Sequence, residues 1–475
     1  MMKNRLKALC SLLLITATQS WAQNTLQQKL TTAFNRLQAD EQCRYGTVSL
    51  TVLDVKTGER IFTGNPNVGL APGSTLKTVT TITAFNLLGK DFRYQTPFGY
   101  NGAITADGTL NGDIIIKGMG DPTLGSWRWE NTTQNYVLNT FVVALRKAGI
   151  KKINGRIIGD DSQYGTQAIP DGWIWQDLGT YYGAGATALC WHENQFDINL
   201  KTGPVGTPIK VGGTTPNVPY LNFKSELTNG VSGTGDNAYP YLPAGLTNIM
   251  YLRGTYAVDQ TKKLISAAYP DPAFDVAFRL LDTLKRLGIT VTGTPESSLS
   301  LTAKGEPAPA MTTTLTTLPS PSLSQIVYWT NRKSLNLYAE ELLKALVSKT
   351  GSQEVTTPNG VTILQNFWKA RGIDVNSMEV TDGCGLSPED RITTMTVATI
   401  MQSARKEAWY PDFYESLPIY NDMHMKSGSI HNVQAYTGYQ THQGRELVFS
   451  IMVNNYNGPG KNIREKMFRV LDELK

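Results

Sequence analysis

The sequence predicts an α+β fold in which an antiparallel sheet, flanked by helices, is built from both ends of the chain and interrupted by a long inserted region. Three observations lead to this prediction. Apolar residues at helical spacing mark a helix near each terminus. Alternating apolar residues mark strands near residues 48–52, 433–439 and 447–453. Three polar motifs, described below, are 260 and 92 residues apart, so a large insertion must leave the domain that holds them and return to it.

The two terminal helices are expected to pack beside each other on the sheet. Their apolar faces consist of Leu26, Leu30, Phe34 and Leu37 near the N-terminus and of Ile463, Met467, Val470, Leu471 and Leu474 near the C-terminus. The strand at residues 48–52 continues through a turn at Lys56-Thr57-Gly58 into Ile61 and Phe62, which predicts a hairpin. The chain ends therefore supply both strands and covering helices.

The first motif is Ser-Thr-Leu-Lys at residues 74–77, which places a hydroxyl and an amine one turn apart on the same helix face. A Pro-Gly pair precedes it as a helix-start signal, and Gly89 ends the apolar pattern that follows. The motif predicts a serine nucleophile, Ser74, with its base, Lys77, at a helix N-terminus. There the helix dipole and free backbone N–H groups favour a developing oxyanion. A second Ser-x-x-Lys begins at Ser403 without such a helix start, and we interpret it as a solvated helix end.

Two further motifs follow in order. Ser334-Leu335-Asn336 is the only Ser-x-Asn in the chain, and Lys426-Ser427-Gly428-Ser429 opens a run of strand candidates. Ser-x-x-Lys, Ser-x-Asn and Lys-Ser/Thr-Gly together are the three elements of penicillin-binding proteins and class A β-lactamases. Literal Lys-Thr-Gly occurs elsewhere, at turns or a helix end, beginning at Lys56, Lys201 and Lys349. A basic strand edge backed by a sheet can line a cleft, which favours the site at Lys426.

With these motifs in place, the chain resembles the low-molecular-mass class C penicillin-binding proteins, which are D-alanyl-D-alanine carboxypeptidases/endopeptidases. The resemblance covers nearly the whole mature chain. It extends to the segments at residues 118–124, 172–173, 182–185, 336–340, 382–387, 438–439 and 453–455. Leu335 stands where the best-known form of the three motifs has Asp, Ser427 where Thr is usual, and Cys384 where the family usually has Ser. For Asp382 and Cys384, a tight turn around Gly383 and Gly385 explains the residues as well as a catalytic part does.

The resemblance implies a penicillin-binding/serine β-lactamase-like catalytic domain with two additional, mainly β, inserted domains. We assign residues 24–97 and 305–475 to the catalytic domain and residues 98–304 to the insertion, with a nested second insert at roughly 195–255. Gly- and Pro-rich strands dominate the insertion. Two helices, at about residues 136–148 and 273–287, interrupt them.

The resemblance also implies acyl transfer through Ser74. Ser74 attacks the carbonyl between two terminal D-alanines of a peptidoglycan stem peptide, and water then hydrolyses the acyl-enzyme. Lys77 must be neutral to take the hydroxyl proton, and burial together with the nearby cation Lys426 would lower its pKa. Ser334 relays a proton toward the leaving amine, and Asn336 holds the substrate amide.

Strand residues complete the expected site. Lys426 and Ser427 bind the terminal carboxylate, since a cation and a hydroxyl suit a free acid. Gly428 leads to Ser429, whose backbone N–H would form the oxyanion hole together with that of Ser74. β-Lactams are expected to acylate the same serine. No cofactor is expected.

The N-terminal pattern, the net charge and the hydropathy limit where the protein acts and what it binds. The N-terminus has the pattern of a cleavable signal peptide within residues 1–23, which predicts export to the periplasm. The pattern consists of a basic cluster (Lys3, Arg5 and Lys7), an apolar stretch from Ala8 to Ala17, and Ser-Trp-Ala before Gln23. Its removal lowers the formal charge from +5 to +2, which gives no indication of nucleic-acid binding. No later run approaches the length of a membrane span. Oligomeric state is not indicated.

The sequence offers no metal-site pattern. The mature chain keeps three cysteines, Cys43, Cys190 and Cys384, an odd number that permits at most one internal disulfide, and we expect them to be small buried residues. The histidines show no metal-ligand spacing; they are His192, His424, His431 and His442.

Two alternative functions share the motifs. A serine β-lactamase would add fast deacylation, but no residue clearly positions the water it needs, and the long insertion argues against it. A non-catalytic peptidoglycan-binding scaffold would keep the cleft without turnover. The intact set of polar residues in all three motifs argues against the scaffold.

Overall fold

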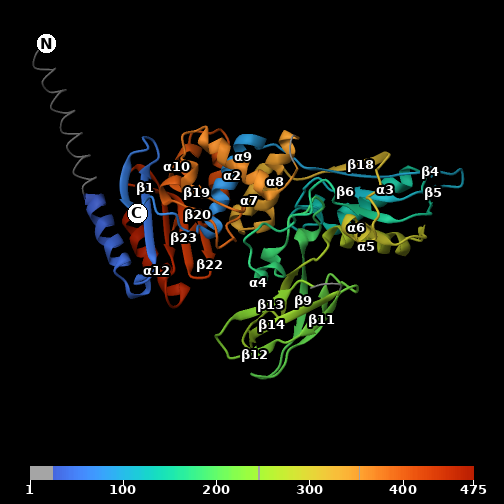
Figure 1. Cartoon of the computed structure of the whole chain (residues 1–475), viewed down its shortest axis with the longest axis horizontal. Helices are drawn as coiled ribbons and strands as arrows, with labels where there is room; N and C mark the ends of the chain where they lie inside the picture. The colour runs from blue at the N-terminus through green and yellow to red at the C-terminus, as the bar shows by residue number, and fades with distance from the viewer. Residues whose placement is uncertain (1–24, 244–246, 352–353) are drawn as a thin grey trace, which may run out of the picture. The chain divides into compact units, whose positions relative to one another are not determined.

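The structure is a computed structural model that describes residues 25–243, 247–351 and 354–475 (Figure 1). The predicted signal peptide lies outside these ranges. The chain forms two compact units, each described by itself. The first contains the residues up to Asn86 together with residues 327–334 and 364–475, and the second contains residues 87–326 and 335–363.

A six-stranded antiparallel sheet forms the centre of the first unit, in the order β2-β1-β24-β23-β22-β21. Its strands are β1 (Thr47–Asp54), β2 (Arg60–Gly64), β21 (Ile419–Tyr420), β22 (Met423–Ile430), β23 (Val433–His442) and β24 (Arg445–Asn454). β1 pairs with β24 along its whole length, from Thr47 opposite Asn454 to Asp54 opposite Leu447. The prediction that both chain ends build one antiparallel sheet is therefore confirmed.

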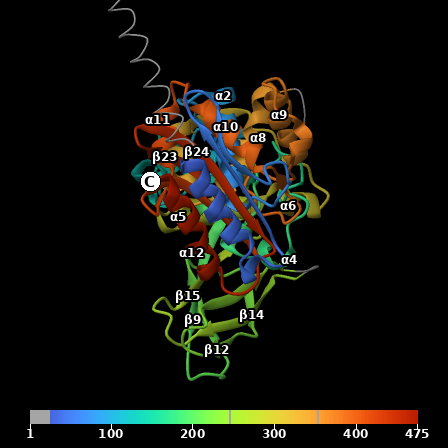
Figure 2. The same cartoon turned by 90° about the vertical axis from the view of Figure 1, so that its left-hand side faces the viewer.

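Helices cover both faces of this sheet. The helix at residues 25–38 and α12 (Gly460–Leu471) lie beside each other on one face (Figure 2), where their apolar residues share a core with Val48 and Leu50 of β1. On the opposite face, the hydroxyl of Ser49 lies 2.7 Å from Oγ1 of Thr394, at the start of α10 (Thr394–Ala404). Successive β1 side chains thus alternate between two buried faces.

The helix that follows the first motif is α2 (Leu76–Leu88), which ends before Gly89 as predicted. It begins one step later than predicted, because Gly73–Thr75 forms a 3₁₀ turn, η2, ahead of it. Gly73 adopts a left-handed backbone conformation, with a φ of 50°, which allows this tight turn. Thr75 Oγ1 donates to the Pro72 carbonyl at 2.8 Å within the same turn. The residues of α2 from Leu76 to Phe85 are all buried. The nucleophile motif therefore stands on a rigid element.

Smaller elements complete the first unit. They are η1 (Glu41–Cys43), η6 (Val375–Ser377), β19 (Met378–Glu379), β20 (Arg391–Ile392), α11 (Tyr410–Ser416) and η7 (Asp472–Leu474). Helix α7 (Leu323–Arg332) begins in the second unit and ends in the first, and so does α9 (Thr357–Lys369).

In the second unit, two sheets pack against helices. The five-stranded sheet, in the order β17-β8-β6-β3-β18, consists of β3 (Gln95–Tyr100), β6 (Ile114–Lys117), β8 (Ile157–Asp160), β17 (Pro295–Ser297) and β18 (Thr313–Pro319). A smaller one contains β4 (Ala103–Ile104), β5 (Thr109–Asn111), β7 (Lys152–Ile153) and β16 (Thr290–Val291). The two predicted helices are present as α3 (Gln134–Lys147) and α5 (Pro272–Arg286), whose apolar residues share one buried core with these sheets.

A β-sandwich forms another part of the second unit. One sheet consists of β9 (Gln195–Lys201), β10 (Lys210–Thr215) and β15 (Leu264–Ala268), and the other of β11 (Asn222–Ser225), β12 (Thr228–Gly230), β13 (Asp236–Tyr241) and β14 (Ile249–Ala257). Both contribute to a common core that includes Phe196, Ile198 and Leu252. Short helical elements of the second unit are η3 (Glu130–Thr132), α4 (Trp175–Leu178), η4 (Tyr181–Gly183), η5 (His192–Asn194) and α6 (Ser298–Ala303).

The remaining helix of the second unit is α8 (Asn336–Thr350), which begins at the last residue of the Ser-x-Asn motif. Its residues from Asn336 to Val347 are all buried. Among the described residues, no helix is both long enough and apolar enough to cross a membrane.

Candidate active site

The structure brings Ser74 and Lys77 together. Ser74 lies in η2 and is half-buried, while Lys77 is fully buried one turn later in α2. Lys77 Nζ lies 2.8 Å from Ser74 Oγ. In its ammonium form Lys77 donates to this hydroxyl, and as a neutral amine it presents a lone pair that can accept the hydroxyl proton. The geometry meets the requirement that a base lie within hydrogen-bond reach of its nucleophile.

A loop at residues 382–387 contacts the same helix. Lys77 Nζ donates to the Cys384 carbonyl oxygen at 2.8 Å, and Thr80 Oγ1 donates to the Gly383 carbonyl oxygen at 2.6 Å. A Cβ atom on Gly385, whose φ is 81°, would lie 2.0 Å from the Gly73 carbonyl oxygen. The absence of a side chain at residue 385 therefore allows the loop to approach η2 closely.

Lys426 and Ser334 form a second contact pair. Lys426 Nζ, on β22, donates to Ser334 Oγ at 2.9 Å and to the Ser427 carbonyl oxygen at 2.7 Å. Burial holds the pKa of the Lys426 amine well below its ordinary value, and repulsion by Lys77 lowers it further. Two amines and two serine hydroxyls are therefore gathered in one unit.

Ser334 itself adopts a left-handed conformation, with a φ of 56°. Such a conformation is uncommon for a residue other than glycine, and it occurs often at functional sites. The helix before it is fixed to α11 and the residue that follows α11, since Asn331 Nδ2 donates to Ser416 Oγ at 2.9 Å and Arg332 Nη1 donates to the Leu417 carbonyl at 3.0 Å. These contacts fix the position from which Ser334 reaches Lys426.

The backbone of β22 packs directly against the nucleophile turn. A Cβ atom on Gly428 would lie 2.9 Å from Ser74 N, and one on Gly73 would lie 2.7 Å from Ser429 N. Both positions therefore require glycine. The close approach places the backbone nitrogens of Ser74 and Ser429 in the same small region. Ser427 is half-buried on the same strand.

Asn336 belongs to the second unit. It is buried at the start of α8, and its Nδ2 donates to the Tyr182 carbonyl oxygen at 2.8 Å. This contact joins the Ser-x-Asn motif to the segment at residues 182–185. Of the eight predicted site residues, seven lie in the first unit and Asn336 lies in the second.

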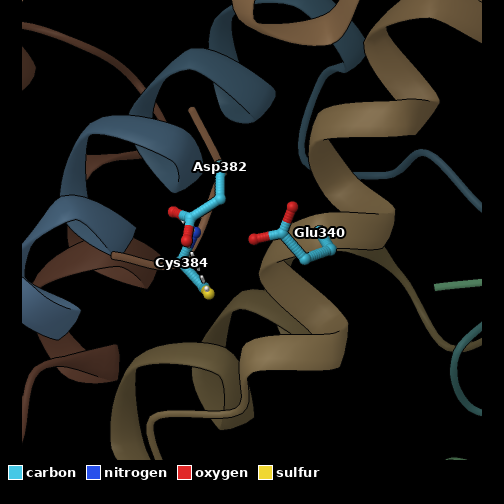
Figure 3. A group of neighbouring side chains, drawn as sticks. All are labelled: Glu340, Asp382 and Cys384. Atoms are coloured by element: carbon cyan, nitrogen blue, oxygen red, sulfur yellow. Dashed lines mark hydrogen bonds between the residues drawn. The ribbon is translucent and has the colours of Figure 1, made fainter. Parts of the chain in front are cut away.

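Two residues whose roles the sequence did not reveal shape the site. Asp382 accepts backbone N–H groups from Cys384 (3.0 Å), Gly385 (2.6 Å), Leu386 (3.0 Å) and Ser387 (2.9 Å). Figure 3 shows its carboxylate beside Cys384, with dashed lines for the hydrogen bonds between them. Two signals marked this loop in the sequence, the resemblance of residues 382–387 to the family and the Asp-Gly-x-Gly pattern, but the pattern also fits an ordinary turn.

Asn454, at the end of β24, is the other such residue. Its Oδ1 accepts from Ala71 N at 2.8 Å, and its Nδ2 donates to the Ala71 carbonyl at 3.1 Å. The amide thus binds both backbone groups of a residue three positions before Ser74. A single buried Asn at a strand end carries no pattern that could have revealed this contact.

The cysteines that the structure describes are buried and not joined in disulfides. The expectation of small buried residues is therefore confirmed for Cys43, Cys190 and Cys384. Burial raises the pKa of the Cys43 thiol to about 11. Cys384 contacts Lys77 through its backbone carbonyl, and its Sγ lies 3.7 Å from Asp382 Oδ2.

Comparisons with known proteins identify the family and the fold. The sequence model of the D-Ala-D-Ala carboxypeptidase 3 (S13) family matches residues 30–474. A D-alanyl-D-alanine carboxypeptidase from Actinomadura sp. (strain R39) is 24% identical over 443 residues, which cover 87% of this chain and 79% of that protein. The crystal structure of penicillin binding protein 4 (dacB) from Haemophilus influenzae aligns with a TM-score of 0.75 and 21% identity, covering 95% of this chain and 98% of that one. The same protein complexed with a β-lactam aligns with a TM-score of 0.69 and 19% identity, over 94% and 98% of the two chains.

Proposed function

The chain belongs to the D-Ala-D-Ala carboxypeptidase 3 (S13) family, and on that premise we propose that it is a serine D-alanyl-D-alanine carboxypeptidase/endopeptidase whose nucleophile is Ser74. The observation that carries this proposal is the 2.8 Å contact between Lys77 Nζ and Ser74 Oγ in a buried setting beside Lys426. The substrates are peptidoglycan stem peptides that end in, or are cross-linked through, a D-alanine carbonyl.

In the proposed reaction, the neutral amine of Lys77 takes the proton of the Ser74 hydroxyl as Ser74 Oγ bonds to the carbonyl carbon. The C–N bond then breaks, and the leaving amine receives a proton through Ser334, which Lys426 holds at 2.9 Å. Water hydrolyses the resulting ester, which restores Ser74. The burial of Lys426 supports this scheme, because burial lowers the pKa of its amine and so makes the protonated amine a better proton donor to Ser334.

Substrate binding is assigned to β22 and to Asn336. Lys426 and Ser427 would bind the terminal carboxylate, and the backbone nitrogens of Ser74 and Ser429 would bind the oxyanion. Gly428 permits the close approach of the strand to the nucleophile turn. Asn336 would hold the substrate amide.

We further propose that the protein is exported to the periplasm after removal of the signal peptide and that β-lactams inhibit it by acylating Ser74. The β-lactam complex of a protein with the same fold supports the second statement. Mass spectrometry of the protein recovered from a periplasmic extract tests the first. An intact N-terminus in the cytoplasmic fraction would contradict it.

The test of function is labelling by a fluorescent penicillin, followed by an assay for D-alanine released from a pentapeptide. We expect a persistent label and D-alanine release, both lowered by a factor on the order of 10⁴ or more in Ser74→Ala. The matched control is Ser403→Ala, which removes the hydroxyl of the other Ser-x-x-Lys and should retain full activity. A label that disappears within seconds would indicate a β-lactamase, and no label at all would indicate a scaffold.

A further inference from the structure

Asp382 organises the loop that holds Lys77. Its two carboxylate oxygens accept four consecutive backbone N–H groups, those of residues 384–387, at 2.6–3.0 Å. The side chain is fully buried. Hydrogen bonds to an ionised carboxylate are about twice as strong as those between neutral groups. Asp382 therefore fixes the backbone path of this loop, because one carboxylate accepts the N–H groups of four successive residues.

A second buried carboxyl, that of Asp390, holds the residue that precedes Asp382. Asp390 is buried near it and accepts from Thr381 N at 2.7 Å and from Thr381 Oγ1 at 3.1 Å. Burial and the charge of Asp382 hold the pKa of the Asp390 carboxyl well above its ordinary value. The hydrogen bond to Thr381 N thus holds the backbone directly before Asp382.

The loop ordered by Asp382 contacts the proposed base through its backbone. The Cys384 carbonyl oxygen, which can only accept, takes an N–H of Lys77 at 2.8 Å. One residue earlier, the Gly383 carbonyl accepts from Thr80, one turn along α2. The Lys77 amine also lies 2.8 Å from Ser74 Oγ. Its hydrogen bond to the Cys384 carbonyl therefore restricts the orientation in which the amine meets the serine hydroxyl.

We propose that Asp382 is a positioning residue for acyl transfer, because it fixes the carbonyl of Cys384 that orients the amine of Lys77 toward Ser74. This inference rests on the proposed function. It also explains how the chain tolerates a cysteine at residue 384, since the contact with Lys77 uses the backbone. A displacement of a catalytic group by about 1 Å can cost on the order of 10²-fold in rate.

The experiment is saturation kinetics of acylation by a fluorescent penicillin, with the full mature chain and its Asp382→Asn variant. The asparagine keeps the shape and one acceptor oxygen, but its NH₂ group faces N–H donors. We expect the maximal acylation rate to fall at least about tenfold, with the half-saturating penicillin concentration unchanged, because the residues of β22 are untouched. Every chain should still become labelled at long times.

That last readout separates positioning from folding. A purely structural role of Asp382 would reduce the fraction of chains that become labelled and leave the rate of the remaining ones at the wild-type value. The matched control is Asp374→Asn, because Asp374 also accepts a backbone N–H, that of Asn376, in an exposed turn of the same unit. It should leave rate and stoichiometry unchanged.

A second variant keeps the inference testable if Asp382→Asn does not fold. Thr80→Val removes the hydrogen bond that anchors the Gly383 carbonyl, and we expect a smaller decrease, about threefold to tenfold, in the same maximal rate. Thr80→Ser keeps the hydroxyl and should restore the rate. Wild-type rates in Asp382→Asn, or in Thr80→Val where the first is unfolded, would overturn the positioning role. No label on the wild-type chain would instead overturn the proposed function.

Discussion

Lys426 in the first unit and Lys344 in the second are both fully buried, yet their surroundings differ. Lys344 Nζ donates to the carbonyls of Gln167 and Ala186 at 2.8 and 2.7 Å, and the negative charges of Glu341 and Glu340 oppose the decrease in pKa that burial causes. Lys426 contacts a serine hydroxyl and a carbonyl, and the nearby charge of Lys77 adds to the effect of burial.

This difference distinguishes a lysine that stabilises the fold from one suited to chemistry. A buried amine is retained for stability when fixed acceptors and opposite charges compensate the loss of water. A buried amine beside another amine is destabilising, and its presence is explained by function. Removal of Lys426 should therefore lower activity and leave stability nearly unchanged, whereas removal of Lys344 should lower stability and leave activity unchanged.

The largest effect is expected for Lys426→Met. We predict that the acylation efficiency with penicillin falls on the order of 10²-fold or more, since a buried charged contact to the substrate carboxylate is lost. The free energy of unfolding should stay within about 1 kcal/mol of wild type, because the lost hydrogen bonds are offset by the removal of a repelled buried cation. Acylation kinetics and urea unfolding check the two parts. A destabilised variant with normal kinetics would make Lys426 a structural residue.

Lys344→Met should show the reverse pattern. The carbonyls of Gln167 and Ala186 lose a buried donor. We predict a decrease of about 1–3 kcal/mol in the free energy of unfolding, with the acylation rate of the folded protein unchanged. Urea denaturation of the second unit and penicillin labelling below the transition measure both. Loss of labelling in a fully folded variant would contradict the assignment of this lysine to the fold.

The carboxyl beside Lys344 provides a pH test. Glu341 contacts Tyr164 OH and Cys190 Sγ, both at 3.2 Å, and burial raises its pKa from 4.5 to about 8. Because the folded state holds this proton more tightly, the unfolded state releases it first, and stability falls as pH rises from about 4.5 to 8. Glu341→Gln removes the titration. The difference in Tm between variant and wild type should therefore shift in favour of the variant between pH 5 and pH 8, and a pH-independent difference would refute the raised pKa.

The smallest effect on the free energy of unfolding is expected for an ion pair on the protein surface. Arg286 Nε lies 3.1 Å from Asp282 on α5, but both side chains are mostly exposed. Arg286→Gln should change the free energy of unfolding by less than about 0.5 kcal/mol, and less still at high salt, because water and ions screen an exposed pair. A decrease of more than about 1 kcal/mol in the free energy of unfolding would contradict the expectation that exposed charge contacts contribute less to stability than buried ones.

Much of the fold could be predicted from local patterns. Apolar spacing predicted the terminal helices, the two helices of the insertion were placed correctly as α3 and α5, and alternation predicted β1, β23 and β24. These predictions succeeded because the period of a helix or strand is written in neighbouring residues. The start of α2 was predicted less well, since the 3₁₀ turn at Gly73 depends on the backbone of β22 that packs against it.

The sequence by itself determined which chemical groups the site contains, because Ser74 and Lys77 are one helical turn apart and need no distant partner to meet. Only the tertiary structure decided how these groups are held. Lys77 and Cys384 are 307 residues apart, and Ser334 and Lys426 are 92 residues apart. Contacts over such separations have no local period, and buried polar groups take whichever partner the packed chain brings within about 3 Å.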